Sequence, residues 1–255
     1  MSLAPHTTEL LFAAGAGAQL VAVSESCDYP PEAKSLPRVS GHRGTNLEAV
    51  LSLKPDRVVA WRGGNRAADV DALRRLGVAV DESEISALAD IGRELRRFSA
   101  WARHDGDRQL ALARANGADQ QLASLRARYA NKRRLRAFYQ LGAGRLFTLS
   151  GQHYVSEALA LCGADNVFAA VPLPAPEVSR EAVLAAKPHV VILADPAALN
   201  DVRQSWSDAG LFPAAMAAGR FVTADGARLH RPTLRSIDAI DALCRQLDEA
   251  RDRIP

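Results

Sequence analysis

The chain has 255 residues, of which 48 % are hydrophobic and 24 % are charged, and its formal net charge is +3. This composition is that of an ordinary globular protein, long enough for one large core or two smaller ones. Basic residues are mixed with acidic ones and no apolar run reaches 18 residues, which argues against a nucleic-acid-binding surface and against a membrane span.

Helix and strand patterns alternate along the first 105 residues. The first helix begins almost at once, with Thr7 or Thr8 as a suitable N-cap, and no charged segment followed by a long apolar run precedes it. We interpret this as a shortened start, from which a signal peptide and a first strand are missing. Helices are expected at 7–15, 45–54, 66–76 and 85–103, and strands at 20–23, 58–60 and 78–80.

A long helical pattern then separates the two halves of the chain. It covers about 106–131 and is expected to connect an N-terminal lobe at 1–105 with a C-terminal lobe at 132–255. The second lobe has expected strands at 135–141, 190–194 and 220–224, and helices at 153–162, 180–187 and 233–250. Such alternation predicts parallel sheets covered by helices, so the expected fold class is α/β, with two lobes joined by a single long helix.

One stretch of sequence occurs in both predicted lobes. Residues 48–59 and 181–192 are identical at seven of twelve positions, with a constant offset of 133. Each copy predicts a helix, a proline that ends it and a buried strand. In the first copy, Thr45 and Glu48 also fit a capping box. The repeat places one glutamate, Glu48 or Glu181, at the same position of each lobe.

Ligands of open parallel sheets bind beyond the carboxyl ends of the strands. Two lobes with such edges facing each other predict a ligand cleft. The chain has no nucleophile-elbow, phosphate-loop or metalloprotease motif, and its six histidines are dispersed, so we expect a binding protein and not an enzyme. Aromatic, glycine and polar residues follow the predicted strands at 27–31, 61–64, 141–144, 195–196 and 225–228.

The three cysteines are Cys27, Cys162 and Cys244, and none has the C-x-x-C spacing of a structural zinc site. Cys162 and Cys244 both lie on apolar faces of predicted helices. This pattern allows either two buried thiols or one disulfide.

Several segments resemble the periplasmic cobalamin-binding proteins of bacterial ABC importers. The resemblance runs in order across nearly the whole chain, and its segments are 4–10 (APHTTEL), 28–31 (DYPP), 46–48 (NLE), 53–56 (LKPD), 60–65 (AWRGGN), 178–181 (VSRE) and 223–225 (TAD). It implies two Rossmann-like lobes of the class III periplasmic binding fold. It also implies a periplasmic monomer without a cofactor, which captures cobalamin or a related corrinoid and delivers it to a permease.

The same resemblance implies roles for the repeated glutamates and for two cysteines. Glu48 and Glu181 would pair with arginines of the permease dimer, although a favourable interaction with the helix dipole alone also explains an acidic residue at each helix start. Cys162 and Cys244 would form a disulfide, which the oxidising periplasm favours, and Cys27 would stay unpaired.

The resemblance places Tyr29, Trp61 and Asp225 in the corrinoid pocket. The chain departs from the family at other pocket positions. His42 stands where the family has a tryptophan, Leu141 where it has a phenylalanine, and 174–176 (PAP) lacks the family's aromatic residue. The position of a family arginine is occupied by Leu229, with Arg228 and Arg231 near it. The full set expected to contact the ligand is Tyr29, His42, Trp61, Arg62, Leu141, Asp225 and Arg228.

Two alternative functions stay open. A haem or ferric-siderophore receptor of the same fold could use His42 as an axial iron ligand, with Arg62, Arg228 and Arg231 near negative groups of the ligand. No other metal ligand is expected. A cytoplasmic α/β enzyme acting on a small anion would need a nucleophile and a base in contact, and the sequence shows no such pair.

Overall fold

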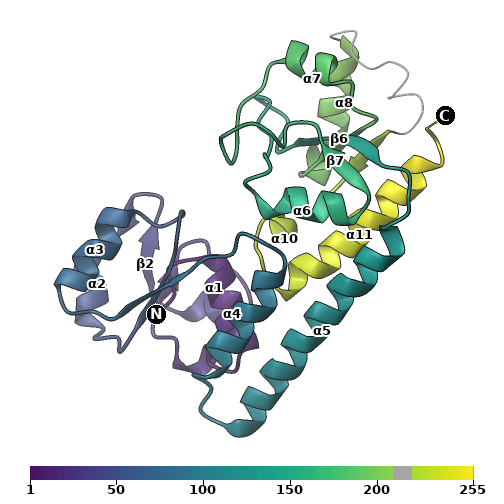
Figure 1. Ribbon diagram of the computed structural model, residues 1–255. Helices are drawn as coiled ribbons and strands as arrows, with labels where there is room; N and C mark the ends of the chain where they lie inside the picture. The colour runs from purple at the N-terminus through teal and green to yellow at the C-terminus, as the bar shows by residue number, and fades with distance from the viewer. Residues whose placement is uncertain (209–219, 255) are drawn as a thin grey trace. The chain divides into compact units, whose positions relative to one another are not determined.

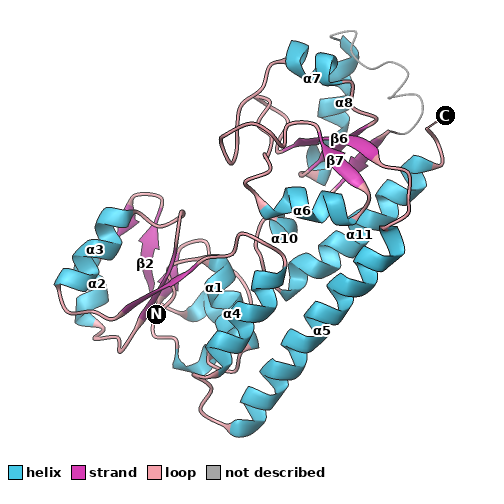
Figure 2. Cartoon of the chain, in the orientation of Figure 1, coloured by secondary structure: helices cyan, strands magenta, loops and turns pink. Residues whose placement is uncertain are grey.

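The computed structural model describes residues 1–208 and 220–254 and divides into two compact units (Figure 1). Unit 1 comprises Met1–Ile85 and Ala89–Asp119, and unit 2 comprises Ser86–Leu88 and Gln120–Pro255. Both units contain parallel strands covered by helices, so the expected α/β class is confirmed (Figure 2). The long helix α5 (Asp105–Tyr129) begins in unit 1 and ends in unit 2.

Unit 1 is built from short strands and helices. Its strands are β1 (Val23–Ser24), β2 (Arg38–Gly41), β3 (Gly44–Thr45), β4 (Val58–Trp61) and β5 (Val80–Ser83). Its α-helices, besides the first part of α5, are α1 (Pro5–Ala13), α2 (Leu47–Ser52), α3 (Ala67–Arg75) and α4 (Ala89–Ser99), and its 3-10 helices are η1 (Gly17–Gln19) and η2 (Pro31–Ser35).

The strands of unit 1 are mostly parallel. β1 pairs with β2 and β4 pairs with β5 in parallel, and Ser2 forms parallel bridges to both Val23 and Val59. β1 and β4 therefore run in the same direction and present their carboxyl ends at one edge. The antiparallel hairpin of β2 and β3 was not expected, because its strands have four and two residues and no alternation of apolar side chains.

The core of unit 1 forms where α2 and α3 cover one face of its strands. Val50 of α2 and Leu73 of α3 are fully buried against Val58 and Ala60 of β4. Helices α1 and α4 pack against each other, and α1 also contacts β4. Burying a valine or leucine side chain stabilises a fold by about 1.5–3 kcal/mol. These contacts therefore fix α2 and α3 against β4.

Unit 2 contains a four-stranded parallel sheet with the order β7-β6-β8-β9. Its strands are β6 (Leu135–Gln140), β7 (Ala164–Asn166), β8 (Val190–Leu193) and β9 (Phe221–Thr223). Its helices, besides the last part of α5, are α6 (Tyr154–Leu161), α7 (Arg180–Ala186), η3 (Pro196–Ala198), α8 (Leu199–Asp208), α10 (Gly226–Leu229) and α11 (Leu234–Arg251).

Helices cover both faces of this sheet (Figure 2). On one face, Val183 of α7 and Trp206 of α8 pack with Phe138 of β6 in a buried cluster. On the other face lie α6 and α11, and α11 runs beside the second part of α5 (Figure 1). Ion pairs and hydrogen bonds between α5 and α11, such as Gln121 to Asp238, fasten the two helices together.

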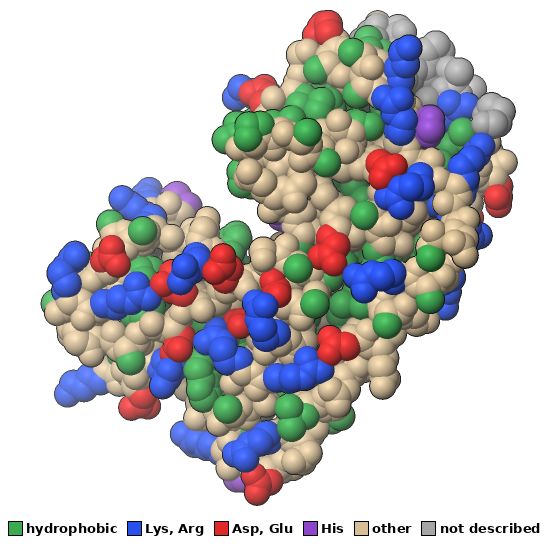
Figure 3. Space-filling view, viewed as in Figure 1, with side chains coloured by type: hydrophobic (Ala, Val, Ile, Leu, Met, Phe, Trp, Pro, Cys, Tyr) green, Lys and Arg blue, Asp and Glu red, His purple; other side chains and the backbone are tan. Residues whose placement is uncertain are grey.

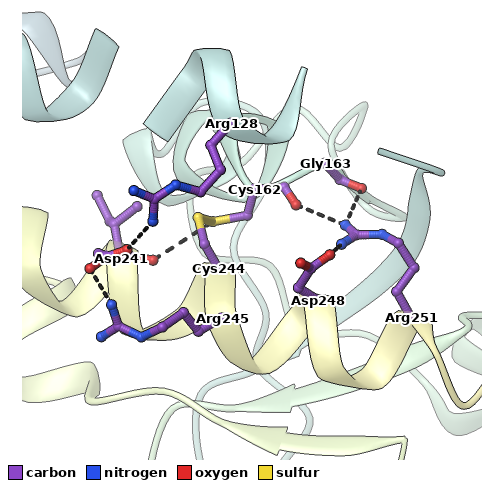
Figure 4. The surroundings of a disulfide bond; sticks show 9 residues. Arg128, Cys162, Gly163, Asp241, Cys244, Arg245, Asp248 and Arg251 are labelled. Carbon is purple, nitrogen blue, oxygen red and sulfur yellow. Dashed lines mark hydrogen bonds and ion pairs between the residues drawn. A yellow bond between two sulfur atoms is a disulfide. The ribbon is translucent and has the colours of Figure 1, made fainter. Parts of the chain in front are cut away.

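A disulfide between Cys162 and Cys244 links the end of α6 to α11 (Figure 4). Their Cα atoms are 4.7 Å apart, within the usual range for a disulfide. The pairing implied by the family resemblance is therefore confirmed. Cys27 is a free and fully buried thiol, with its Sγ within hydrogen-bonding distance of the Thr8 and Ser24 hydroxyls.

The predicted capping box at Thr45 and Glu48 is wrong. Thr45 belongs to β3, where its amide donates to the Asp69 carboxylate at 2.8 Å and its hydroxyl lies 3.3 Å from that of Ser40. Asn46 is the N-cap of α2 instead, and its side-chain oxygen accepts the Ala49 amide at 3.0 Å. Thr45 is therefore engaged in the hairpin, and the N-cap of α2 is the next residue, Asn46.

Candidate ligand-binding site

The carboxyl edge of unit 1 presents two aromatic side chains to solvent. Trp61 is the last residue of β4 and is 42 % exposed, and Tyr29 follows β1 and is 41 % exposed. Aromatic rings that are partly exposed to water gain from being covered, so two of them at one edge of a sheet indicate a surface that a ligand can cover. The Trp61 backbone amide donates to Asn65 Oδ1 at 2.7 Å, which fixes the turn after the strand.

Arg62 and His42, two other residues expected to contact the ligand, also lie in unit 1. The Arg62 guanidinium makes ion pairs with Glu82 at 3.6 Å and Glu84 at 3.4 Å, so its charge is partly compensated within the unit. His42 lies in the turn between β2 and β3, with a side chain that is 80 % exposed and a ring nitrogen 3.8 Å from Glu25. Its exposure leaves a ring nitrogen accessible to a ligand.

The carboxyl edge of unit 2 gathers the expected residues Leu141, Asp225 and Arg228. Leu141 directly follows β6 and is half-buried, while Asp225 follows β9 and caps the short helix α10. Arg228 is exposed and makes an ion pair with Asp225 at 3.3 Å. Leu229 stands at the position of the family arginine. It is fully buried and has no polar group that could contact a ligand.

Two of the six dispersed histidines, to which sequence reasoning assigned no role, lie at this same edge. His153 caps α6, with its Nδ1 accepting the Val155 amide at 3.2 Å, and its ring stacks on Tyr154. His230 Nε2 lies 2.9 Å from the Tyr139 hydroxyl, and the two imidazole centroids are 6.3 Å apart. The only signal for them in the sequence is their position, since His153 comes after β6 and His230 comes after α10.

The electrostatics keep these imidazoles neutral. Burial, with a smaller effect of His230, lowers the pKa of His153 to about 4. Burial also lowers the pKa of His230, against the opposing effect of Asp225. Because the backbone hydrogen bond occupies the lone pair of His153 Nδ1, the ring proton sits on Nε2. In this tautomer His153 can donate a hydrogen bond to a ligand, but neither ring nitrogen has a free lone pair with which to bind a metal ion.

Each unit also has a cavity. A cavity of about 350 Å³ in unit 1 is lined by Leu20, Lys54 and Trp101 among others, and one of about 420 Å³ in unit 2 is lined by Gln140, Arg145 and Trp206 among others. None of the seven residues expected to contact the ligand lines either cavity. The cavity of unit 2 nevertheless adjoins the carboxyl end of β6, because Gln140 is the last residue of that strand and Ala143 and Gly144 follow it.

The described residues hold no cluster of three or more His, Cys, Asp or Glu side chains that could bind a metal ion. Within 1–208 and 220–254, no helix is long and apolar enough to cross a membrane. Basic and acidic side chains are intermingled on the face shown in Figure 3, in agreement with the scattered charges of the sequence. This face therefore lacks the continuous basic surface that binding to nucleic acid requires.

The two repeated glutamates occupy equivalent places. Glu48 and Glu181 are exposed and lie in the first turns of α2 and α7, after the N-caps Asn46 and Ser179. Hydrogen bonds from its own backbone amide and from the Ser179 hydroxyl lower the pKa of Glu181, so this carboxylate is negatively charged at neutral pH. Each unit therefore presents an accessible glutamate from the same helix start.

Comparison with known proteins decides the family. A family model described as periplasmic binding protein matches residues 1–209. The chain belongs to the periplasmic binding protein family. It is 37 % identical over 244 residues to a vitamin B12-binding protein of Vibrio vulnificus, which covers 96 % of this chain and 88 % of that protein.

Solved structures of this family have the same fold. The periplasmic vitamin B12 binding protein BtuF of Vibrio cholerae matches with a TM-score of 0.89 and 37 % identity, over 98 % of this chain and 96 % of that one. A periplasmic haem-binding protein from Pseudomonas aeruginosa matches with a TM-score of 0.76 and 25 % identity, over 95 % and 90 % of the two chains. This periplasmic binding protein therefore has the class III fold implied by the resemblance.

Proposed function

We propose that this periplasmic binding protein captures cobalamin or a related corrinoid and delivers it to the permease of an ABC importer in the inner membrane. The observation that carries the proposal is 37 % identity to vitamin B12-binding proteins along nearly the whole chain. The exposed rings of Tyr29 and Trp61 support it, because a flat macrocycle can stack on aromatic surfaces. The role is one of binding and transport, without catalysis.

Each unit offers candidate residues for contacts with the ligand. Tyr29, Trp61 and Arg62 would contribute rings and a cation from unit 1, and Asp225, Arg228 and Leu141 would contribute from unit 2. His153 adds a neutral hydrogen-bond donor at the carboxyl edge of unit 2, where the chain lacks the aromatic residues of the family. Corrinoids carry peripheral amides, whose carbonyl oxygens suit such a donor.

Glu48 and Glu181 would form the contacts with the permease. Two exposed carboxylates, one on each unit, can pair with two arginines of a dimeric permease. A single exposed ion pair contributes only about 0–1 kcal/mol, so the pairs would govern orientation and encounter more than affinity. The native compartment would be the periplasm, where the disulfide between Cys162 and Cys244 is stable.

The deciding experiment is a titration of the purified protein with cyanocobalamin, followed by tryptophan fluorescence and by calorimetry. We expect saturable binding of one ligand per chain, weakened at least tenfold by Trp61→Ala. Trp101→Phe is the control, because Trp101 packs against Arg57 and Arg97, and Arg57 precedes the amino-terminal end of β4, opposite to its carboxyl end.

Haemin titrated in parallel tests the alternative raised by the haem-binding relative. A shifted Soret band that His42→Ala removes, with no response to cobalamin, would assign the protein to haem. A failure of both ligands to bind would refute the corrinoid proposal and leave only the family.

A further inference from the structure

The Trp61 indole is partly exposed and contacts two other residues of unit 1, His6 and Gly64. The His6 ring meets it edge to face, with centroids 5.3 Å apart and an angle of 84° between the planes. Gly64 lies against the six-membered part of the indole, so closely that a Cβ atom at this position would overlap ring carbons. All three residues belong to unit 1 and lie at the carboxyl edge of its strands.

His6 is an unusual residue for this position. It lies in the first turn of α1 and is only 3 % exposed, and its Nε2 has no hydrogen-bond partner among the described residues. Burying an unpaired polar atom costs about 1–3 kcal/mol, so hydrogen bonding does not explain this side chain. Its ring contact with Trp61 offers an explanation, because edge-to-face pairs stabilise one relative orientation of two rings.

The two glycines after Trp61 have different roles. Gly63 has a positive φ of 85° and open space where a Cβ would lie, so it is required by the backbone of the turn. Gly64 is outside the left-handed region, and the three atoms nearest to a Cβ at this position all belong to the indole. Because Gly64 has no side chain, the indole of Trp61 can pack directly against the backbone of the turn.

We propose that His6 is a positioning residue that, together with Gly64, fixes the orientation of the Trp61 indole before a ligand arrives. A ring so held offers its exposed surface to a flat macrocycle without first losing rotational freedom, which lowers the cost of binding. This inference rests on the proposed function for the identity of the ligand. The fixed orientation itself is a property of the free protein.

Fluorine NMR of protein labelled with 5-fluorotryptophan tests the fixed orientation without ligand. The chain has three tryptophans, and Trp61→Phe assigns the resonance of interest. We expect one narrow Trp61 line in the parent protein, a shifted and broadened line in His6→Ala, and a narrow line again in His6→Phe, which restores a ring. His104→Ala is the control, since His104 is an exposed histidine of the same unit.

Gly64→Ala keeps the inference testable if His6→Ala fails to fold. Its methyl group would displace the indole, and we expect the Trp61 resonance to shift while those of Trp101 and Trp206 do not. An unchanged Trp61 line in a folded His6→Ala protein, or in Gly64→Ala, would overturn the inference.

Cyanocobalamin titration of the same variants then connects ring orientation to binding. We expect His6→Ala to weaken binding about two- to tenfold, the effect of ordering one side chain, and His6→Phe to restore it. Equal affinities of His6→Ala and the parent protein would contradict a role in positioning. Absence of cobalamin binding by the parent protein would refute the proposed function, while the NMR result would still decide whether His6 and Gly64 hold the ring.

Discussion

Lys54 and Lys187 adopt the same left-handed backbone conformation, with φ angles of 42° and 45°. They are related by the offset of 133 in the internal repeat, and each is followed by a proline. Their amides donate to the carbonyls of Leu51 and Leu184, at 3.1 and 3.0 Å. The repeat therefore conserves, in both units, the geometry that ends a helix and starts the turn toward a buried strand.

Lys54→Gly and Lys187→Gly should each stabilise the protein. A side chain in the left-handed region costs about 1 kcal/mol or more, and glycine avoids this cost. We expect the melting temperature to rise by about 2–4 °C per substitution, measured by calorimetry. Lys54→Ala separates conformation from loss of charge, and it should give no such gain. Equal effects of alanine and glycine would contradict the conformational explanation.

Replacing both Glu48 and Glu181 by alanine should leave cobalamin binding intact and reduce uptake. The loss of two ion pairs weakens docking by up to about 2 kcal/mol, or roughly 30-fold. Uptake of radiolabelled cobalamin by cells that carry the protein and its permease measures this effect. The control is Glu32→Ala with Glu249→Ala, which removes one exposed glutamate from each unit. A comparable loss of uptake in the control would rule out specific docking.

Removing the disulfide should destabilise unit 2 strongly. The cross-link joins residues separated by 82 positions, and the chain-entropy model gives about 4.5 kcal/mol for a loop of this size. Denaturant unfolding of a Cys162→Ala, Cys244→Ala protein measures the loss. In the parent protein, unfolding without reductant should expose a single reactive thiol, that of Cys27. Three reactive thiols would contradict the pairing.

Arg251, which lies beside the disulfide, should also contribute strongly to the stability of unit 2 (Figure 4). Its guanidinium is buried and donates to the carbonyls of Arg133, Cys162 and Gly163. Arg251→Met leaves these acceptors without their donor, and we expect a loss of about 3 kcal/mol or more in the free energy of unfolding.

Arg245→Met is the matched control for Arg251→Met. Arg245 lies on the same helix α11, but it is exposed, and among the described residues its ion pair is with Asp241. Its loss should cost no more than about 1 kcal/mol. Similar losses for both variants would show that the buried carbonyl contacts do not stabilise unit 2.

Stability of unit 1 should fall in mildly acidic solution because of His6. Burial lowers the pKa of His6 to about 4, whereas an unfolded histidine titrates near its usual value of about 6.5. Between these values the unfolded state binds more protons, so the free energy of unfolding decreases as the pH falls from about 6.5 to 4, by roughly 3 kcal/mol in total. Urea unfolding at a series of pH values measures the slope.

His6→Phe should flatten this dependence on pH, because phenylalanine does not titrate. His104→Ala, which removes an exposed histidine, should leave the slope unchanged. A slope that is the same in His6→Phe as in the parent protein would assign the effect to other groups, such as His153 of unit 2.

The internal repeat shows how much of the fold can be predicted from local sequence. Glu48, Lys54 and Pro55, and their counterparts at 181, 187 and 188, predicted a helix, its end and a buried strand in each half, and all of these are present. The hairpin of β2 and β3 was missed because it depends on pairing and not on an apolar pattern. Thr45 was misread for the same reason, since the hairpin engages its amide and hydroxyl.

The sequence by itself determined the α/β class, the two similar halves and the long helix between them, because periodicity and helix-ending prolines act over a few residues. Only the tertiary structure decided which side chains meet. His6 lies 55 positions before Trp61, and His153 lies 77 before His230, yet each pair is in ring contact. Such contacts depend on how strands are paired and helices packed, and no local pattern records them.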